Sequence, residues 1–115
     1  MTIMSRTLHL VMTKDWYNLV ESGQKTEEYR KFIPFYWKRL FKKSRLWDEK
    51  SIRVYYETHG ELPKEFDTVT FHYGYSKKFM VYELKKIRLG HDGPAEWGCP
   101  QDEDVFMIGL GKRIE

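Results

Sequence analysis

The sequence predicts an α+β domain in which a small, mostly antiparallel β-barrel of about five to six strands is flanked by two or three helices. The length of 115 residues suits one domain with a single modest core. Helical spacing of apolar residues is found early in the chain, whereas alternating apolar runs dominate the second half. A hydrophobic content of 41% indicates that the chain folds. We therefore expect one domain over residues 1–115.

The first elements follow from short local patterns. Residues 7–12 are a short apolar run with Leu8, Leu10 and Met12 on one side, and this pattern predicts a strand. Thr13 is suited to cap a helix over residues 14–22, because a threonine hydroxyl accepts backbone N–H bonds at a helix start. The apolar positions that give this helix one buried face are Trp16, Leu19 and Val20. Gly23 follows, where the chain needs a left-handed conformation after the helix.

Residues 25–30 form an extended run that is almost entirely polar. Alternation places Thr26, Glu28 and Arg30 on one face and Lys25, Glu27 and Tyr29 on the other. Neither face is an ordinary apolar core face. Glu28 and Arg30 lie about 6.6 Å apart at the usual strand rise, so they can converge on one ligand or pair with each other. Lys25 is positioned to supply a third charged group, and an ion-pair lattice of the three is the structural alternative.

A basic, aromatic segment comes next, and Pro34 is placed to begin a helix within it. Its cations are Arg30, Lys31, Lys38, Arg39, Lys42, Lys43 and Arg45. The interleaved aromatic residues are Phe32, Phe35, Tyr36, Trp37 and Phe41, and the expected buried stripe is Trp37, Leu40 and Phe41. The chain has a net charge of +3, so these seven cations are a local patch on an otherwise acidic chain. Such a patch suits single-stranded nucleic acid, although a solvated basic helix face over core aromatics fits the same pattern.

The second half contains the strands that complete the sheet. Residues 44–65 are interpreted as an insertion of uncertain form, strand or helical turn. Residues 68–73 and 79–84 predict a hairpin whose second strand continues toward Leu89 across a bulge. Residues 90–104 form a long loop of the kind that often lines sites, and residues 105–110 form the last strand. In the strand over 68–73, the outward positions are Thr68, Thr70 and His72.

The sequence also predicts the cellular location of the protein. Cys99 is the single cysteine, so no internal disulfide forms, and residues 1–6 lack the pattern of a secretory leader. No apolar run approaches the length that spans a membrane. We expect a cytoplasmic protein with no membrane contact. The four histidines show no spacing that makes a zinc site with Cys99, so we expect neither a metal nor a cofactor.

The motif Gly23-x-Lys25-x-x-Glu28-x-Arg30 resembles the G-x-K-x-x-E-x-R signature of the ASCH domain family, relatives of the PUA domain. The surrounding order of strand, helix, glycine turn and polar strand also resembles small bacterial members. So do the hairpin at residues 73–76, the loop at residues 96–98 and the closing strand. The resemblance covers the whole chain except residues 44–65.

This resemblance implies a PUA-like barrel with a cleft that binds RNA or a nucleotide. Gly23 would make the turn into the cleft, and Lys25 would reach a phosphate or a reacting group. Glu28 and Arg30 would project into the same cleft. From their loop positions, Tyr75 and Ser76 are candidates to reach a phosphate, and Trp97 to stack on a base or cover the cleft. A plain hairpin turn and packing under the loop are the respective alternatives.

The expected function is binding of single-stranded RNA or a nucleotide-like small molecule, with phosphates held by Lys31, Lys38, Arg39, Lys42, Lys43 and Arg45. The resemblance adds an RNA-processing hydrolase as an alternative, with Lys25 and Glu28 as its catalytic residues. That enzyme would be a single-strand ribonuclease or an N4-acetylcytidine amidohydrolase. The amidohydrolase branch has a threonine three residues after the motif lysine, where this chain has Glu28; Thr26 has the wrong offset. A third alternative is an interaction module whose basic helix meets an acidic protein.

Overall fold

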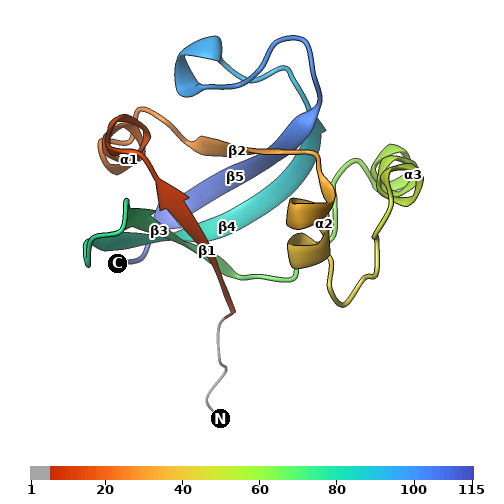
Figure 1. Cartoon of the computed structure of the whole chain (residues 1–115), viewed down its shortest axis with the longest axis horizontal. Coiled ribbons are helices and arrows are strands. Elements are labelled where there is room, and N and C mark those ends of the chain that lie inside the picture. Colours follow the sequence, from red (N-terminus) through yellow and green to blue (C-terminus); the bar gives the residue numbers. More distant parts are fainter. Residues whose placement is uncertain (1–5) are drawn as a thin grey trace.

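Five strands form one strongly curled sheet in the order β1-β3-β4-β5-β2, in a computed structural model that describes residues 6–115 (Figure 1). The strands are β1 (Thr7–Met12), β2 (Glu27–Lys31), β3 (Thr68–Tyr73), β4 (Phe79–Gly90) and β5 (Val105–Arg113). The helices are α1 (Lys14–Glu21), α2 (Pro34–Leu40) and α3 (Glu49–His59), with a 3₁₀ turn, η1 (Ala95–Trp97), in the last long loop. The α+β prediction is confirmed, and the sheet curls into a half-barrel whose edge strands β1 and β2 do not pair with each other.

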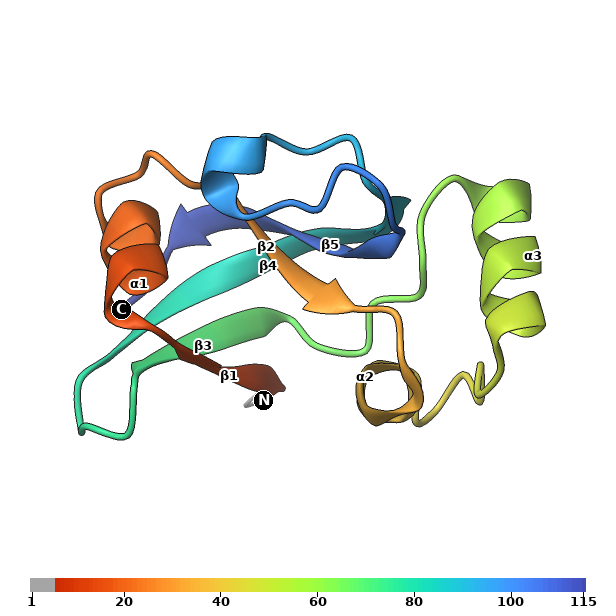
Figure 2. The same ribbon diagram turned by 45° about the horizontal axis from the view of Figure 1, so that its top comes forward.

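The sheet is mixed because β1 and β3 run parallel, while the other three pairings are antiparallel. The edge strands β1 and β2 lie on the same side of the molecule, with α1 following β1 and α2 following β2 (Figure 2). The register of β4 against β5 shifts between Tyr82 and Lys86, which confirms the predicted bulge. A bulge increases local bend and twist, which helps this long strand to curl.

The core lies inside the curl of the sheet, where alternate side chains of the strands meet the helices. In β1 the inward residues Leu8, Leu10 and Met12 are buried, as the alternation predicts. The prediction for α1 was partly wrong: its buried residues are Tyr17 and Val20, whereas Trp16 is half-buried. The Tyr17 ring packs edge-on against the Tyr73 ring of β3, with the ring centroids 5.0 Å apart.

Of the two residues predicted to define the ends of α1, one behaves as expected. Thr13 occupies the N-cap position, but its side chain makes no capping hydrogen bond, so that expectation was wrong. Gly23 adopts φ +82°, the left-handed conformation predicted after the helix. The backbone N–H of Lys25 donates to the carbonyl of Leu19 at 3.0 Å, so Lys25 belongs to the turn and β2 begins only at Glu27.

Residues 44–65, whose form the sequence left open, contain the helix α3. The Asp48 side chain accepts a hydrogen bond from the backbone N–H of Ser51 at 2.8 Å, and Gly60 ends the helix at φ +77°. Ile52 is the buried residue of this helix. A helix that buries so little carries only a weak amphipathic pattern, which is why the sequence was ambiguous there.

Two threonines of β3 point outward as predicted and are nevertheless buried. Thr68 and Thr70 lie on the outer face, yet both are buried. Neighbouring strands crowd them, since the hydroxyl oxygens of Thr70 and Thr7 are 2.7 Å apart across the β1–β3 pair. The outer face is therefore closely packed here.

Within residues 6–115, no helix has both the length and the apolar character needed to cross a membrane. The leader prediction concerned residues 1–6, and residues 1–5 of these lie outside the described part of the chain.

Glu65 joins the segment after α2 to the segment before β3. Its two carboxylate oxygens accept hydrogen bonds from the backbone N–H groups of Lys43 and Ser44, each at 2.8 Å, and from the Ser44 hydroxyl at 2.6 Å. Burial raises the pKa of Glu65, but these hydrogen bonds lower it by more, so the pKa lies below its ordinary value. The ionised form therefore stabilises the fold.

Replacing Glu65 with Gln is expected to lower the free energy of unfolding by about 1–2 kcal/mol at neutral pH, because charge-assisted hydrogen bonds are lost. The folded-state pKa is lowered, so this contribution is complete above the ordinary carboxyl pKa and disappears as pH falls through the folded value. Melting curves of wild type and Glu65→Gln should therefore converge as the solution is acidified. Glu61→Gln, at an exposed carboxylate nearby, is the control and should melt like wild type. An equal loss in both variants would contradict the assignment.

Candidate functional site

A cavity of about 480 Å³ opens on the side of the molecule where the two edge strands face each other. It is lined by the end of β1, the start of α1, most of β2, the start of α2 and the turn after η1. Four of these elements come from the first 40 residues, and the fifth is brought in by the long loop before β5. The open side of the half-barrel is therefore also the side that carries a hollow.

The structure brings together part of the predicted site. Lys25, Glu28, Arg30, Lys31 and Trp97 all line this cavity. Gly23, Tyr75 and Ser76 are not among its lining residues. Gly23 makes the turn after α1, while Tyr75 is fully exposed on the β3–β4 hairpin and the Ser76 hydroxyl donates to the backbone of that hairpin.

Three charged side chains at the cavity form a continuous chain of ion pairs. Lys25 Nζ lies 3.0 Å from Glu28 Oε1, and Arg30 Nη2 lies 2.8 Å from Glu28 Oε2. Glu28 Oε1 also accepts the backbone N–H of Tyr29 at 3.0 Å. One carboxylate thus holds two cations, and the group as a whole carries one positive charge.

Lys25 is held by carbonyl and ring contacts as well as by its ion pair. The residue is only 2% exposed, which is rare for a lysine. Its ammonium group donates to the carbonyl of Trp97 and lies 4.3 Å from the Trp16 ring centroid and 5.4 Å from that of Tyr29. Cation–π attraction of this kind partly replaces lost hydration. Lys25 therefore ties the loop that carries η1 to the start of β2.

Arg30 spans the gap between the edge strands. Its Nη2 donates to the carbonyl of Val11 on β1 at 3.1 Å, and Nη1 lies 3.4 Å from the Tyr36 hydroxyl. Burial lowers the pKa of Arg30, but the Glu28 carboxylate and the Tyr36 hydroxyl raise it by more, so its pKa lies above the ordinary value. Arg30 is accordingly a permanent cation at this site.

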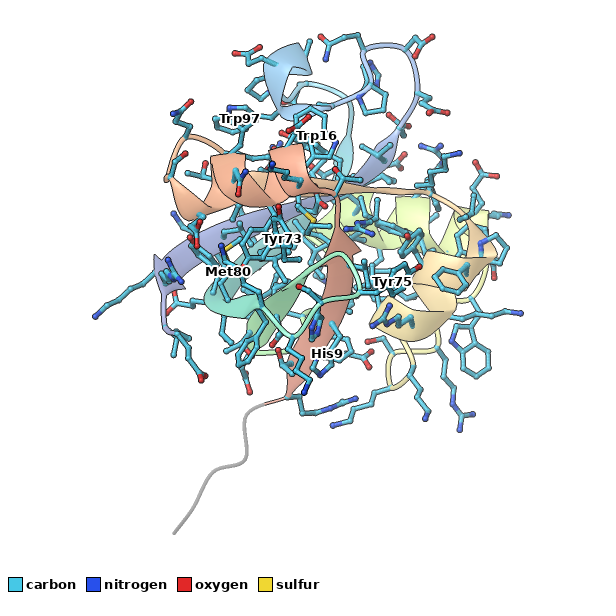
Figure 3. The ribbon with its side chains drawn as sticks, turned by 60° about the vertical axis from the view of Figure 1, so that its left-hand side comes forward. His9, Trp16, Tyr73, Tyr75, Met80 and Trp97 are labelled. Carbon is cyan, nitrogen blue, oxygen red and sulfur yellow. The ribbon has the colours of Figure 1, made fainter. Side chains whose placement is uncertain are left out.

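Aromatic rings line the cavity around the charged chain. They belong to Trp16, Tyr29, Phe35, Tyr36 and Trp97. Figure 3 shows Trp16 and Trp97 in the same part of the molecule, by α1 and the last long loop. Sequence reasoning assigned Trp16 to the core, because its position fits the helical stripe. The position of the Trp16 ring depends on Gly98, a residue distant in the sequence. Gly98 has φ +90°, and a Cβ added to it would lie only 2.9 Å from the Trp16 ring.

A second ion pair, between Glu27 of β2 and Arg88 of β4, lies next to this chain of charges. Arg88 Nη2 lies 3.0 Å from Glu27 Oε2, and the Tyr29 hydroxyl donates to Glu27 Oε1 at 2.9 Å. Burial, followed by the hydrogen bond to Glu27, raises the pKa of Tyr29. Tyr29 is therefore uncharged, and its ring packs beside the Lys25 ammonium group.

The predicted basic residues surround α2. Lys38, Arg39, Lys42, Lys43 and Arg45 are all exposed, on α2 or directly after it. Arg39 donates from Nη2 to the carbonyl of His9 on β1, so it lies at the sheet edge. Together with Lys31 at the cavity, these six residues form what we call the α2 basic surface.

The charged chain is better suited to hold and orient a ligand than to transfer protons. Both Glu28 oxygens already accept bonds from Lys25, Arg30 and the peptide N–H of Tyr29. Arg30 has donor capacity left at Nη1, which carries two N–H groups and whose hydrogen-bond partner among residues 6–115 is the Tyr36 hydroxyl at 3.4 Å. A ligand that offers an acceptor oxygen therefore complements this site. Among the same residues, no group of three or more His, Cys, Asp or Glu side chains lies close enough to hold a metal ion.

Comparisons with family models, with curated proteins and with solved structures found no match for this chain.

Proposed function

We propose that the chain is an ASCH-type domain that binds a nucleotide or single-stranded RNA, with a base in the cavity and phosphates on the α2 basic surface. The observation that carries this proposal is the cavity itself. It combines a buried Lys25–Glu28–Arg30 chain with the rings of Trp16 and Trp97. Base recognition in single strands uses such a combination of stacking and a few fixed polar groups.

The size and chemistry of the cavity support a base-sized ligand. A volume of about 480 Å³ is within the range for small-molecule sites, about 300–1,000 Å³. The rings give a planar base apolar surface to stack on. The remaining N–H of Arg30 Nη1 can donate to a carbonyl oxygen of the base, and the net positive charge of the ion-pair chain favours an electron-rich edge.

The surroundings of the cavity support a ligand that carries phosphate. Lys31 lies in the cavity lining, and the cations of α2 begin one turn beyond Phe35. Phe35 is 66% exposed beside the opening, where it can stack on a neighbouring base. A nucleotide whose base enters the cavity would thus direct its phosphate toward the α2 basic surface.

Trp97→Ala is expected to weaken the binding of nucleoside monophosphates about tenfold, because a stacked ring is worth about 1–3 kcal/mol per base. Calorimetric titration with each of the four monophosphates measures this and shows which base is preferred. Trp47→Ala is the matched control, since Trp47 is 48% exposed and lies outside the cavity lining. Equal affinity in Trp97→Ala and wild type would contradict base binding at this site.

A separate assay tests the hydrolase alternative. Wild type and Lys25→Ala are incubated with mixed-sequence single-stranded RNA that carries acetylated cytidines, and the intact masses of the RNA are measured. Shortened or deacetylated RNA that is missing with Lys25→Ala would replace the binding proposal with an enzyme. Unchanged masses together with saturable binding support the binding domain. Binding of an acidic protein that nucleotides do not displace would favour the interaction module.

A further inference from the structure

A second hollow, of about 370 Å³, lies on the outer face of the sheet over β1, β3 and β4. Its lining includes Thr7 and His9 of β1, Thr70 and His72 of β3, and Phe79 of β4. In β1 the alternate residues point the other way, into the core. We call this hollow the outer groove, and it is distinct from the cavity beside β2.

Three rings cross the outer groove in a row, one from each strand. His9 and His72 stack with centroids 5.1 Å apart, and His9 Nδ1 lies 2.8 Å from His72 Nε2. His72 and Phe79 are directly opposite in the β3–β4 register, with centroids 6.4 Å apart. His9 is exposed and Phe79 is 45% exposed. Exposed rings on neighbouring strands of a sheet are a known type of platform for single-stranded bases.

The edge of β1 connects this groove to the cavity. Val11 lines the cavity and His9 lines the groove, and they lie two residues apart on the same face of β1, about 6.6 Å at the usual rise. Their carbonyl oxygens accept hydrogen bonds from Arg30 and Arg39, respectively. Positive charge therefore runs along the β1 edge from one hollow to the other. Figure 3 shows His9 on β1, well away from Trp16 and Trp97.

We propose that a single-stranded RNA held in the cavity continues over the edge of β1 and stacks a further base on the row formed by His9, His72 and Phe79. This inference rests on the proposed function. Charge complementarity favours RNA as the occupant, because Arg39 lies between the two hollows where a phosphate would cross. Arg39 would then contact the phosphate between the two bound bases.

The charged groups beside the histidine pair are Arg39, through the backbone of His9, and Glu115 in the groove lining. Arg39 favours a phosphate at this point, whereas Glu115 opposes it.

The test compares a short probe with a long one. Nucleoside monophosphates report on the cavity alone, and a mixed-sequence single-stranded RNA dodecamer reports on both hollows. The double variant His9→Ala/His72→Ala and the single variant Phe79→Ala are each expected to bind the dodecamer about tenfold more weakly, with monophosphate affinity unchanged. His59→Ala, at an exposed histidine of α3, is the control and should match wild type.

The outcomes separate this inference from the function it rests on. If both groove variants bind the dodecamer like wild type while monophosphates still bind, the inference is overturned and the proposed function stands. If wild type binds neither probe, both are overturned. If sedimentation shows a dimer of wild type that the double variant loses, the outer groove is occupied by a second copy of the chain, and the RNA path is wrong. Circular dichroism of each variant establishes that the fold is retained, and Phe79→Leu replaces Phe79→Ala if the latter unfolds.

Discussion

Glu28→Ala is expected to destabilise the protein by about 3–5 kcal/mol, the largest loss we expect from a single substitution in the site. Glu28 is the common partner of two cations, and Lys25 is only 2% exposed. Removing the carboxylate leaves a buried ammonium group with no opposite charge, and such a group costs far more than the ion pair itself contributes. Urea unfolding followed by circular dichroism measures the change.

Two comparisons show whether the cause is the unpaired charge. Glu27→Ala removes the neighbouring carboxylate of β2, whose partner Arg88 is more exposed than Lys25, and should cost clearly less. Adding Lys25→Met to Glu28→Ala should restore much of the lost stability, because the buried ammonium group is then gone. If Glu28→Ala unfolds at nearly the wild-type urea concentration, the three charges are not an essential part of the fold.

The second large effect concerns the salt dependence of RNA binding. Replacing Lys38, Lys42 and Lys43 together with Gln should make the logarithm of the affinity depend less steeply on the logarithm of salt concentration. For single strands the slope is roughly −0.7 for each neutralised phosphate, so losing three contacts should reduce its magnitude by about 2. The affinity at low salt should fall about tenfold or more. Fluorescence anisotropy of a labelled single-stranded RNA at several salt concentrations gives both values.

The matched control removes the same number of charges elsewhere. Lys85, Lys86 and Lys112 are exposed on β4 and β5, outside the α2 basic surface. Their triple replacement with Gln should leave the slope unchanged, although the net charge falls equally. If both triple variants lose affinity and slope alike, the basic residues act only through overall charge and the α2 surface is not the phosphate path.

Much of the fold was predictable, because local patterns agreed with the final packing. The inward alternation of β1, the left-handed Gly23 and the bulge in β4 are set by neighbouring residues, and each was recognisable from them. The form of residues 44–65 was not, since α3 buries only Ile52 among its eleven residues. A helix with one buried residue has no clear amphipathic pattern by which its sequence could be recognised.

The candidate site was predictable to the extent that it lies within one strand and the turn that precedes it. A polar strand with no apolar face needs partners of its own, and Lys25, Glu28 and Arg30 are those partners for one another. The position of Trp16 was not predictable, because only the distant loop at Gly98 gives its ring a place beside the cavity. Tyr75 has an aromatic ring and a hydroxyl group that could bind a ligand, but it lies in a turn that is fully exposed to solvent.

Arg30 of β2 and Arg39 of α2 both bind the free edge of β1. A half-barrel leaves an edge strand with carbonyl groups that face outward, and such an edge can recruit a strand from another molecule and begin aggregation. Arg30 and Arg39 already occupy the carbonyls of Val11 and His9 with bulky, charged groups. The two side chains proposed to contact a ligand at this opening therefore also hinder another molecule from pairing a strand with β1.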